Sequence, residues 1–446
     1  MLKGTFNYTP PAALGGSARD YRYPRGADLQ GRIEGFYKWQ NLRRQHGLWP
    51  FSRSTDEGPQ AVTAARDDAG GCFRGVNFAS EDYLNLGSHP ALKALAHEVI
   101  EQFGLHSAGS AAVMGATPYS VQLERVVADF LGAAEAVLFP TGWAAAYGAI
   151  KGLARPTDHV VLDAFAHAAL KEGAAAATKN VYLFRHNSLE DCRGWLQKVR
   201  AQDPQNGILL VTESLFSMES DTPDLRALQA LCDEFDATLL VDVSQDLGAT
   251  GPGGRGALGA QGMVGTVDLV VGSFSKAFGS NGGFVACRSR EVKEYLRFFS
   301  PTCAHSSTLS PLQAATVMKA FEIIDGPEGD ALRARLMGNV ESLRRQLLDA
   351  GFELYGEPSG VVCIKIGAEG LARLVARRLP EAGLVATLAE FPAVPKNKAR
   401  LRLQVMAEHS EENLRDAVAA LTAAFAAGSE EFEWLDSERE KLRVNG

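Results

Sequence analysis

Between residues 70 and 325 the sequence alternates short apolar runs with longer segments of helical periodicity. The apolar runs are typical of parallel strands that are buried on both faces of a sheet. We expect strands at residues 136–139, 159–162, 207–213, 238–242 and 269–272, and helices at 120–131, 144–153, 189–201 and 225–235. This alternation predicts a doubly wound α/β domain with a mostly parallel central sheet.

The pattern changes on both sides of this region. Residues 1–65 are rich in Gly, Pro, Arg and aromatic residues, and predict an N-terminal arm with one helix over 28–46. Such an arm either packs on a neighbour or is a partly disordered terminus. The large domain would span 66–325, and a smaller α+β domain with a charged tail would span 326–446. In this smaller domain we expect strands at 353–354, 360–366 and 400–405, and helices at 331–350, near 370–382 and from 410.

Composition narrows the class of protein. The chain has 446 residues, 46% of them hydrophobic, and a net charge of −8, which fits a globular protein of at least two domains and argues against a nucleic-acid binder. Because no apolar run reaches the roughly 20 residues of a membrane span, and the N-terminus has no apolar signal segment, we expect neither. Six scattered cysteines without a CxxC pair predict no metal site and a reducing cytoplasm.

One lysine lies at the end of a predicted strand of this α/β domain. Lys276 follows the predicted strand 269–272 and lies among small and hydroxyl residues that include Ser273 and Ser275. A lysine that forms a Schiff base must reach a cofactor aldehyde at a strand end, and the two hydroxyls can bind a phosphate. Taken alone, a lysine beside serines is more often a surface residue.

Asp242 strengthens this interpretation, because it ends the preceding predicted strand. Pyridoxal 5′-phosphate (PLP) needs a carboxylate at its pyridine nitrogen, so that the ring can act as an electron sink. A strand-terminal aspartate followed one strand–helix step later by a strand-terminal lysine supplies both partners. The alternative for Asp242 is an ordinary strand-end or capping residue.

Two further strand ends fit the same cofactor. Thr141, Gly142 and Trp143 follow the strand at 136–139, where a turn into a helix points backbone N–H groups at an anion such as a phosphate. The alternative is a tight turn with Thr141 as a helix cap. His167 follows the strand at 159–162 and could stack on the pyridine ring, or it could be a structural histidine.

Several collinear segments between about residues 75 and 425 resemble the α-oxoamine synthases, which are fold-type I PLP enzymes. They are NFASEDYL from Asn77, HSAGSAAVMG, FPTGW, FRHNS, SFSKAFGSNGGF and LRLQVMAEHS. FRHNS and the long N-terminal arm favour the serine palmitoyltransferase branch, and 8-amino-7-oxononanoate synthase is similar as well. The resemblance implies a large PLP domain followed by a smaller C-terminal domain.

The resemblance also implies roles for individual residues. Lys276 carries the cofactor and acts as acid and base at the substrate Cα, Asp242 pairs with the pyridinium nitrogen, and His167 stacks on the ring. Gly142, Trp143, Ser273 and Ser275 lie on the phosphate side. Arg402 binds the carboxylate of the amino acid. Ser306 and Ser307 reach the phosphate of a neighbouring subunit, which implies a homodimer with shared sites.

Three positions depart from the pattern of the family. After Asp242 the family has an acid and then a histidine, where this chain has Val243 and Gln245; Gln245 can still hydrogen-bond the phenolate oxygen of PLP but cannot titrate. Ala111 stands where the family often has arginine. These departures leave the amino acid, the acyl chain and its carrier open, and favour a lipid or specialised-metabolite branch.

The implied reaction is the decarboxylative condensation of an amino acid, with a serine-like one favoured, and an acyl thioester of CoA or an acyl carrier protein. The product is an α-amino ketone. A PLP-dependent aldolase or transaminase-like enzyme on the same fold is the second interpretation, because Gln245 breaks the pattern. A non-catalytic subunit of a synthase is the third, although such subunits lack the lysine.

Overall fold

The computed structural model describes residues 9–68 and 70–444. The chain divides into two compact units: one joins the residues up to Ser80 to those from Gly338 onward, and the larger one spans Glu81–Met337. None of the helices in the described part is both long enough and apolar enough to cross a membrane. The domain boundaries predicted after residues 65 and 325 stay proposals about how the chain folds.

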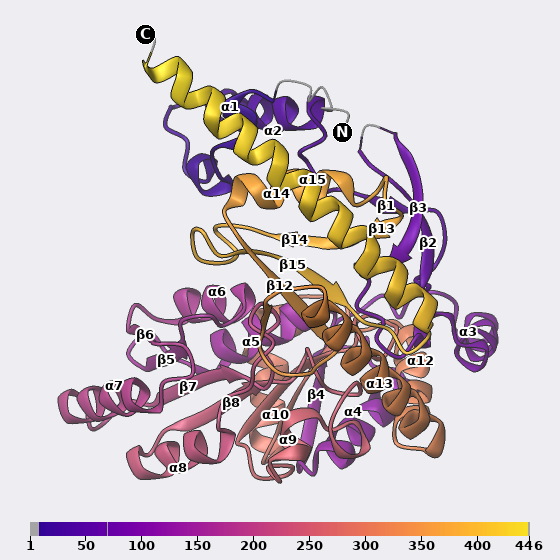
Figure 1. Ribbon diagram of the computed structural model, residues 1–446. Helices are drawn as coiled ribbons and strands as arrows, with labels where there is room; N and C mark the ends of the chain where they lie inside the picture. The colour runs from indigo at the N-terminus through magenta and orange to yellow at the C-terminus, as the bar shows by residue number, and fades with distance from the viewer. Residues whose placement is uncertain (1–8, 69, 445–446) are drawn as a thin grey trace. The chain divides into compact units, whose positions relative to one another are not determined.

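A seven-stranded sheet forms the centre of the larger unit (Figure 1). Its order is β4-β10-β9-β8-β7-β5-β6, and β10 is antiparallel to both of its neighbours while the other described pairs are parallel. The strands are β4 (Glu135–Phe139), β5 (His159–Asp163), β6 (Val181–Phe184), β7 (Ile208–Glu213), β8 (Thr238–Asp242), β9 (Leu269–Ser273) and β10 (Gly283–Cys287). The mostly parallel sheet expected from the alternation is confirmed.

Helices connect these strands, and local chemistry sets where they begin. Side chains of Thr117, Thr141 and Asp224 cap three of them by accepting backbone N–H groups of the first turn. The helices are α3 (Pro90–Phe103), α4 (Pro118–Leu131), α5 (Gly142–Leu153), α6 (Ala168–Ala177), α7 (Leu189–Gln202), α8 (Leu225–Phe235), α9 (Gly256–Ala260), α10 (Arg290–Phe299), α11 (Pro301–Ala304), α12 (Pro311–Ile324) and α13 (Pro327–Asp349).

One apolar cluster of the larger unit lies between the sheet and helices that include α5 and α6. Every residue of β5, β7 and β9 is buried, as expected for central strands. Residues of α5 and α6 join one apolar cluster with side chains from six strands, among them Val137, Val160, Val211, Leu240, Val271 and Val285. This packing holds the strand ends in fixed positions, and the residues discussed below lie at those ends.

The smaller unit contains two four-stranded sheets. In the first, the order is β1-β2-β3-β13, and in the second it is β11-β12-β15-β14. The strands are β1 (Ser54–Thr55), β2 (Val62–Arg66), β3 (Cys72–Asn77), β11 (Leu354–Tyr355), β12 (Val361–Gly367), β13 (Leu384–Val385), β14 (Thr387–Ala389) and β15 (Ala399–Gln404). The helices are α1 (Pro11–Leu14), α2 (Glu34–Gln45), α14 (Glu369–Arg378) and α15 (Glu411–Val444).

The structure corrects the predicted elements in several places. The helix expected over 28–46 begins only at Glu34, because the preceding residues Gly31–Ile33 form a tighter 3₁₀ turn. Strands β1 and β2 lie in or at the end of the segment predicted as an arm, and residues 1–8 of that arm lie outside the described part. The sequence also missed β6, a half-exposed edge strand, and β10, which begins at a glycine. Both are short apolar runs, VYLF and GFVAC, that the sequence analysis did not assign as strands.

Candidate active site

A cavity of about 270 Å³ lies at the carboxyl ends of the parallel strands in the larger unit. Ligands of doubly wound sheets bind at this edge. Nine residues predicted from the sequence line it: Thr141, Gly142, Trp143, His167, Asp242, Gln245, Ser273, Ser275 and Lys276. Five others were missed: Ala146, Glu213, Ser217, Ser244 and Asn281.

Three predicted residues are not among those lining the cavity. Ser306 and Ser307 lie in the segment between α11 and α12, where Ser307 is exposed. Arg402 belongs to the smaller unit, where it is buried on β15 opposite Cys363 of β12.

Asp242 is the last residue of β8 and is buried, with 7% of its surface exposed. Its Oδ1 accepts the backbone N–H of Ser244 at 2.8 Å, which orients the carboxylate at the strand end. Asp242 is thus a strand-end residue that lines the cavity, and its role toward a cofactor stays a prediction.

Glu213 is the carboxylate that the sequence analysis missed. It ends β7, pairs in register with Asp242, and is buried. Burial, and then the charge of Asp242, raise the pKa of Glu213 well above its usual value, which favours the neutral acid. Its Oε1 accepts the backbone N–H of His167 at 2.5 Å. The same strand-end position that drew attention to Asp242 would have identified it.

His167 caps α6, because its Nδ1 accepts the backbone N–H of Ala169 at 3.3 Å. Burial lowers the pKa of His167 more than the charge of Asp242 raises it, so the ring is held neutral. His167 therefore has the structural role of a helix cap and also lines the cavity, and its stacking on a cofactor ring stays a prediction.

Lys276 lies in the turn after β9, with 16% of its side chain exposed, and its Nζ is 4.0 Å from Oε2 of Glu81. The hydroxyls of Ser273 and Ser275 are 2.8 Å apart, and the backbone N–H of Ser275 donates to Oγ of Ser273 at 3.2 Å. Lysine, hydroxyls and carboxylates thus share one wall of the cavity.

The turn between β4 and α5 also lines the cavity. Oγ1 of Thr141 accepts the backbone N–H of Ala144 at 3.0 Å, so Thr141 is the cap of α5. A Cβ added to Gly142 would lie 2.4 Å from Cβ of Ser273, so only glycine lets this turn approach the end of β9. Trp143 stacks on Tyr147 with ring centroids 5.2 Å apart and stays 48% exposed.

The structure explains each departure from the family pattern locally. Val243 is buried and its N–H donates to the carbonyl of Val271, so it belongs to the core of the sheet. Gln245 lines the cavity, and its amide donates to the hydroxyl of Tyr83. Ala111 packs against the apolar cluster of the sheet.

Comparisons with known proteins agree with this geometry. The model of the family Aminotransferase class I and II matches residues 74–421. An 8-amino-7-oxononanoate synthase of Geobacter metallireducens is 34% identical over 77% of this chain and 87% of its own length. A 2-amino-3-ketobutyrate coenzyme A ligase of Escherichia coli K12 is 31% identical over 85% of this chain and 94% of its own length.

A solved serine palmitoyltransferase from S. paucimobilis, with PLP and myriocin bound, superposes with a TM-score of 0.84 at 28% identity. The match covers 90% of this chain and 99% of that chain. This chain therefore belongs to the Aminotransferase class I and II family and has the fold-type I architecture of PLP-dependent transferases. Within that family it is similar to the α-oxoamine synthases, as the sequence resemblance implied.

Proposed function

We propose that this chain is a PLP-dependent α-oxoamine synthase. It condenses an amino acid with an acyl thioester, and it releases CO₂, a free thiol and an α-amino ketone. The observation that carries the proposal is that Lys276, Asp242 and His167, from three different strand ends, line one cavity. The similar synthases and the serine palmitoyltransferase structure support the same reaction class.

The residues of the cavity fit PLP. Gly142 lets Ser273 approach the N-terminus of α5, where backbone N–H groups attract a phosphate. The hydroxyls of Ser273 and Ser275 stand across from this turn and can donate to the same phosphate. When bound, PLP supplies an electron sink for negative charge at the substrate Cα.

The other side chains that line the cavity each have a role in this proposal. The carboxylate of Asp242 pairs with the ring nitrogen and keeps it protonated. The amine of Lys276 attaches the cofactor and then moves the proton at the substrate Cα. The neutral ring of His167 covers one face of the cofactor, and the amide of Gln245 hydrogen-bonds its phenolate oxygen.

Substrate and subunit assignments extend the proposal. Arg402 binds the carboxylate of a serine-like amino acid, since a guanidinium matches a carboxylate with two hydrogen bonds. The acyl group arrives on CoA or on an acyl carrier protein. Ser306 and Ser307 reach the phosphate of the other subunit of a homodimer. A cytoplasmic location stays a prediction.

A PLP-dependent aldolase or transaminase-like activity is the second candidate. Gln245, which cannot titrate and is bonded to Tyr83, favours it because it replaces an ionisable residue at the cofactor. A non-catalytic subunit is the third candidate, and the presence of both Lys276 and Asp242 in the cavity argues against it.

The test is to incubate the purified protein with PLP, a panel of amino acids and an acyl thioester, and to measure CO₂ and free thiol. The proposed reaction releases the two in equal amounts, whereas transamination or aldol cleavage releases neither. Lys276→Ala should abolish both products and the yellow colour of lysine-bound PLP. The exposed Lys319→Ala should change nothing. Full turnover by Lys276→Ala would refute the proposal.

A further inference from the structure

His186, which does not line the cavity, lies between two carboxylates of the larger unit. Its Nδ1 is 2.9 Å from Oδ1 of Asp163, and its Nε2 is 3.0 Å from Oδ2 of Asp221. Asp163 is fully buried, and 17% of the His186 side chain is exposed. Each ring nitrogen faces an acceptor, so each must donate a proton, and only the charged imidazolium has two N–H groups.

The electrostatic balance agrees with this geometry. Burial lowers the pKa of His186, but the hydrogen bonds with Asp163 and Asp221 outweigh it and raise the pKa to about 9. Within the same loop, Arg185 pairs with Asp191 at 3.5 Å. From α6, Lys171 acts electrostatically on Asp163 and Glu213. The ring is therefore charged at neutral pH.

The three residues come from three different strand ends. Asp163 ends β5, His186 follows β6, and Asp221 lies in the loop after β7, where its backbone pairs with Phe216. The His186 ring stacks on Phe165, with centroids 4.6 Å apart, and meets the edge of Phe216 at 4.5 Å. His186 thus connects the loops that follow β5, β6 and β7 at the carboxyl edge of the sheet.

Two of these loops carry cavity residues. The first loop runs from Asp163 to His167, and His167 lines the cavity. Oδ1 of Asp163 also accepts the backbone N–H of Phe165 at 2.7 Å and so fixes this loop. The loop after β7 places Ser217 in the cavity wall, one residue from Phe216. A shift at His186 would therefore reach His167 on one side and Ser217 on the other.

We propose that His186 is a positioning residue, whose imidazolium clamps the loops after β5 and β7 so that His167 and Ser217 face the cofactor. The inference rests on the proposed function, because it takes the cavity to hold PLP. In this proposal His186 touches neither the substrate nor the cofactor. Its effect passes through the residues that it contacts, chiefly Asp163 and Asp221.

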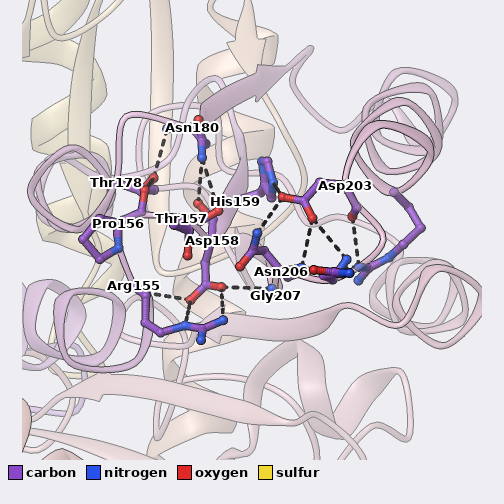
Figure 2. A network of polar contacts seen from close by, with 12 residues as sticks. Arg155, Pro156, Thr157, Asp158, His159, Thr178, Asn180, Asp203, Asn206 and Gly207 are labelled. Carbon is purple, nitrogen blue, oxygen red and sulfur yellow. Dashed lines mark hydrogen bonds and ion pairs between the residues drawn. The ribbon is translucent and has the colours of Figure 1, made fainter.

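The chain offers a matched control at the other end of β5. His159, the first residue of that strand, pairs with Asp203, with Nε2 and Oδ2 3.0 Å apart (Figure 2). It is buried, and its ring stacks on Tyr182 at 5.9 Å. His159→Phe removes a comparable histidine–carboxylate pair from the amino-terminal end of the strand, where it has no link to the cavity.

The first experiment measures protonation directly. In the full-length protein labelled with ¹⁵N-histidine, the ring of His186 should carry two protons at neutral pH and lose one only near pH 9. The assignment comes from the resonance that disappears in His186→Phe, or that shifts in Asp221→Asn should that variant not fold. A ring that is neutral at neutral pH would overturn the inference. This measurement needs no cofactor, so its outcome is independent of the proposed function.

The second experiment measures positioning in the holoenzyme. His186→Phe should raise the Kd for PLP and lower kcat by roughly tenfold or more, with the KM for the acyl thioester unchanged, because small displacements of cofactor-facing groups are costly. His159→Phe should leave the Kd for PLP and kcat within about twofold of the wild-type values. Equal effects of the two variants on PLP binding would show that His186 is only structural.

Asp221→Asn adds a test that depends on pH. An asparagine amide can donate to the unprotonated Nε2, so the clamp no longer needs the charge. A raised pKa stabilises the folded state below the ordinary histidine pKa, and this contribution is lost as the pH rises through about 9. Wild type should therefore lose PLP affinity above that pH while Asp221→Asn keeps it. Parallel profiles of the two proteins would contradict the clamp.

Discussion

At the scale of single residues, the site depends on two carboxylates that differ in charge. Asp242 and Glu213 are register partners on adjacent strands, and two negative charges so close in a buried position would repel each other strongly. Burial and the charge of Asp242 raise the pKa of Glu213 more than the hydrogen bond from the N–H of His167 lowers it, so Glu213 accepts that N–H as a neutral acid. Asp242 can then carry the charge that the ring nitrogen requires.

This assignment predicts different outcomes for two substitutions of Glu213. Glu213→Gln keeps an oxygen for the N–H of His167 and adds no charge, so turnover and stability should stay within about threefold and about 1 kcal/mol of wild type. Glu213→Ala leaves that N–H without an acceptor and should cost about 1–3 kcal/mol. Urea denaturation and steady-state rates measure both effects. A Glu213→Gln variant that unfolds as readily as Glu213→Ala would mean that the carboxylate is charged.

At the scale of elements, the turn from β4 into α5 packs against the end of β9, and residues of both segments line the cavity. Thr141 caps α5, and its helix starts at the point where Ser273 ends β9. Because the two segments come this close, only a residue without a side chain fits at position 142.

Gly142→Ala should therefore weaken PLP binding by roughly tenfold or more, since its Cβ would press on Ser273 and displace the hydroxyl side of the site. The matched control is Gly194→Ala, in the middle of α7, where an added Cβ meets nothing within 4 Å. That change should be neutral or stabilise by up to about 1 kcal/mol. Fluorescence titration with PLP and thermal unfolding separate the two effects. Unchanged PLP affinity in Gly142→Ala would place the phosphate elsewhere.

At the scale of the whole molecule, the proposed homodimer explains features that lie outside the cavity, namely the segment with Ser306 and Ser307 and two exposed apolar side chains. Thr308, which directly follows Ser306 and Ser307, donates its N–H to the carbonyl of Gly109 at 3.0 Å. Nearby along the chain, Val113 is 85% exposed and Met114 is 88% exposed. Large apolar side chains on a surface beside a functional segment favour burial against another copy.

We expect sedimentation to give about twice the chain mass of 47.8 kDa. If the sites are shared, Lys276→Ala and the double variant Ser306→Ala, Ser307→Ala should each be impaired alone. When they are co-expressed with different tags, the mixed dimer has one site with both defects and one intact site. Its activity should exceed that of both parents. A monomer, or a mixed dimer no better than its parents, would contradict shared sites.

The sequence by itself determined which side chains stand at the strand ends. Thr141, His167, Asp242 and Lys276 each follow an apolar run, and parallel strands bring such ends to one edge of a sheet whatever their order within it. This is why the fold class and eight residues of the cavity wall could be predicted from the strand ends, while the ninth, Gln245, came from the family resemblance.

Only the tertiary structure decided which ends are neighbours. In the sheet β7 pairs with β5 and not with β6, which precedes it in the chain, and this order brings the loops that carry His186 and Asp221 to Asp163. The register of β7 on β8 sets Glu213 beside Asp242. The antiparallel strand β10 and the bond of Gln245 to Tyr83 likewise depend on contacts between segments far apart in the chain. Local patterns record burial and periodicity, whereas these pairings arise from packing between strands, which the sequence of any one segment does not contain.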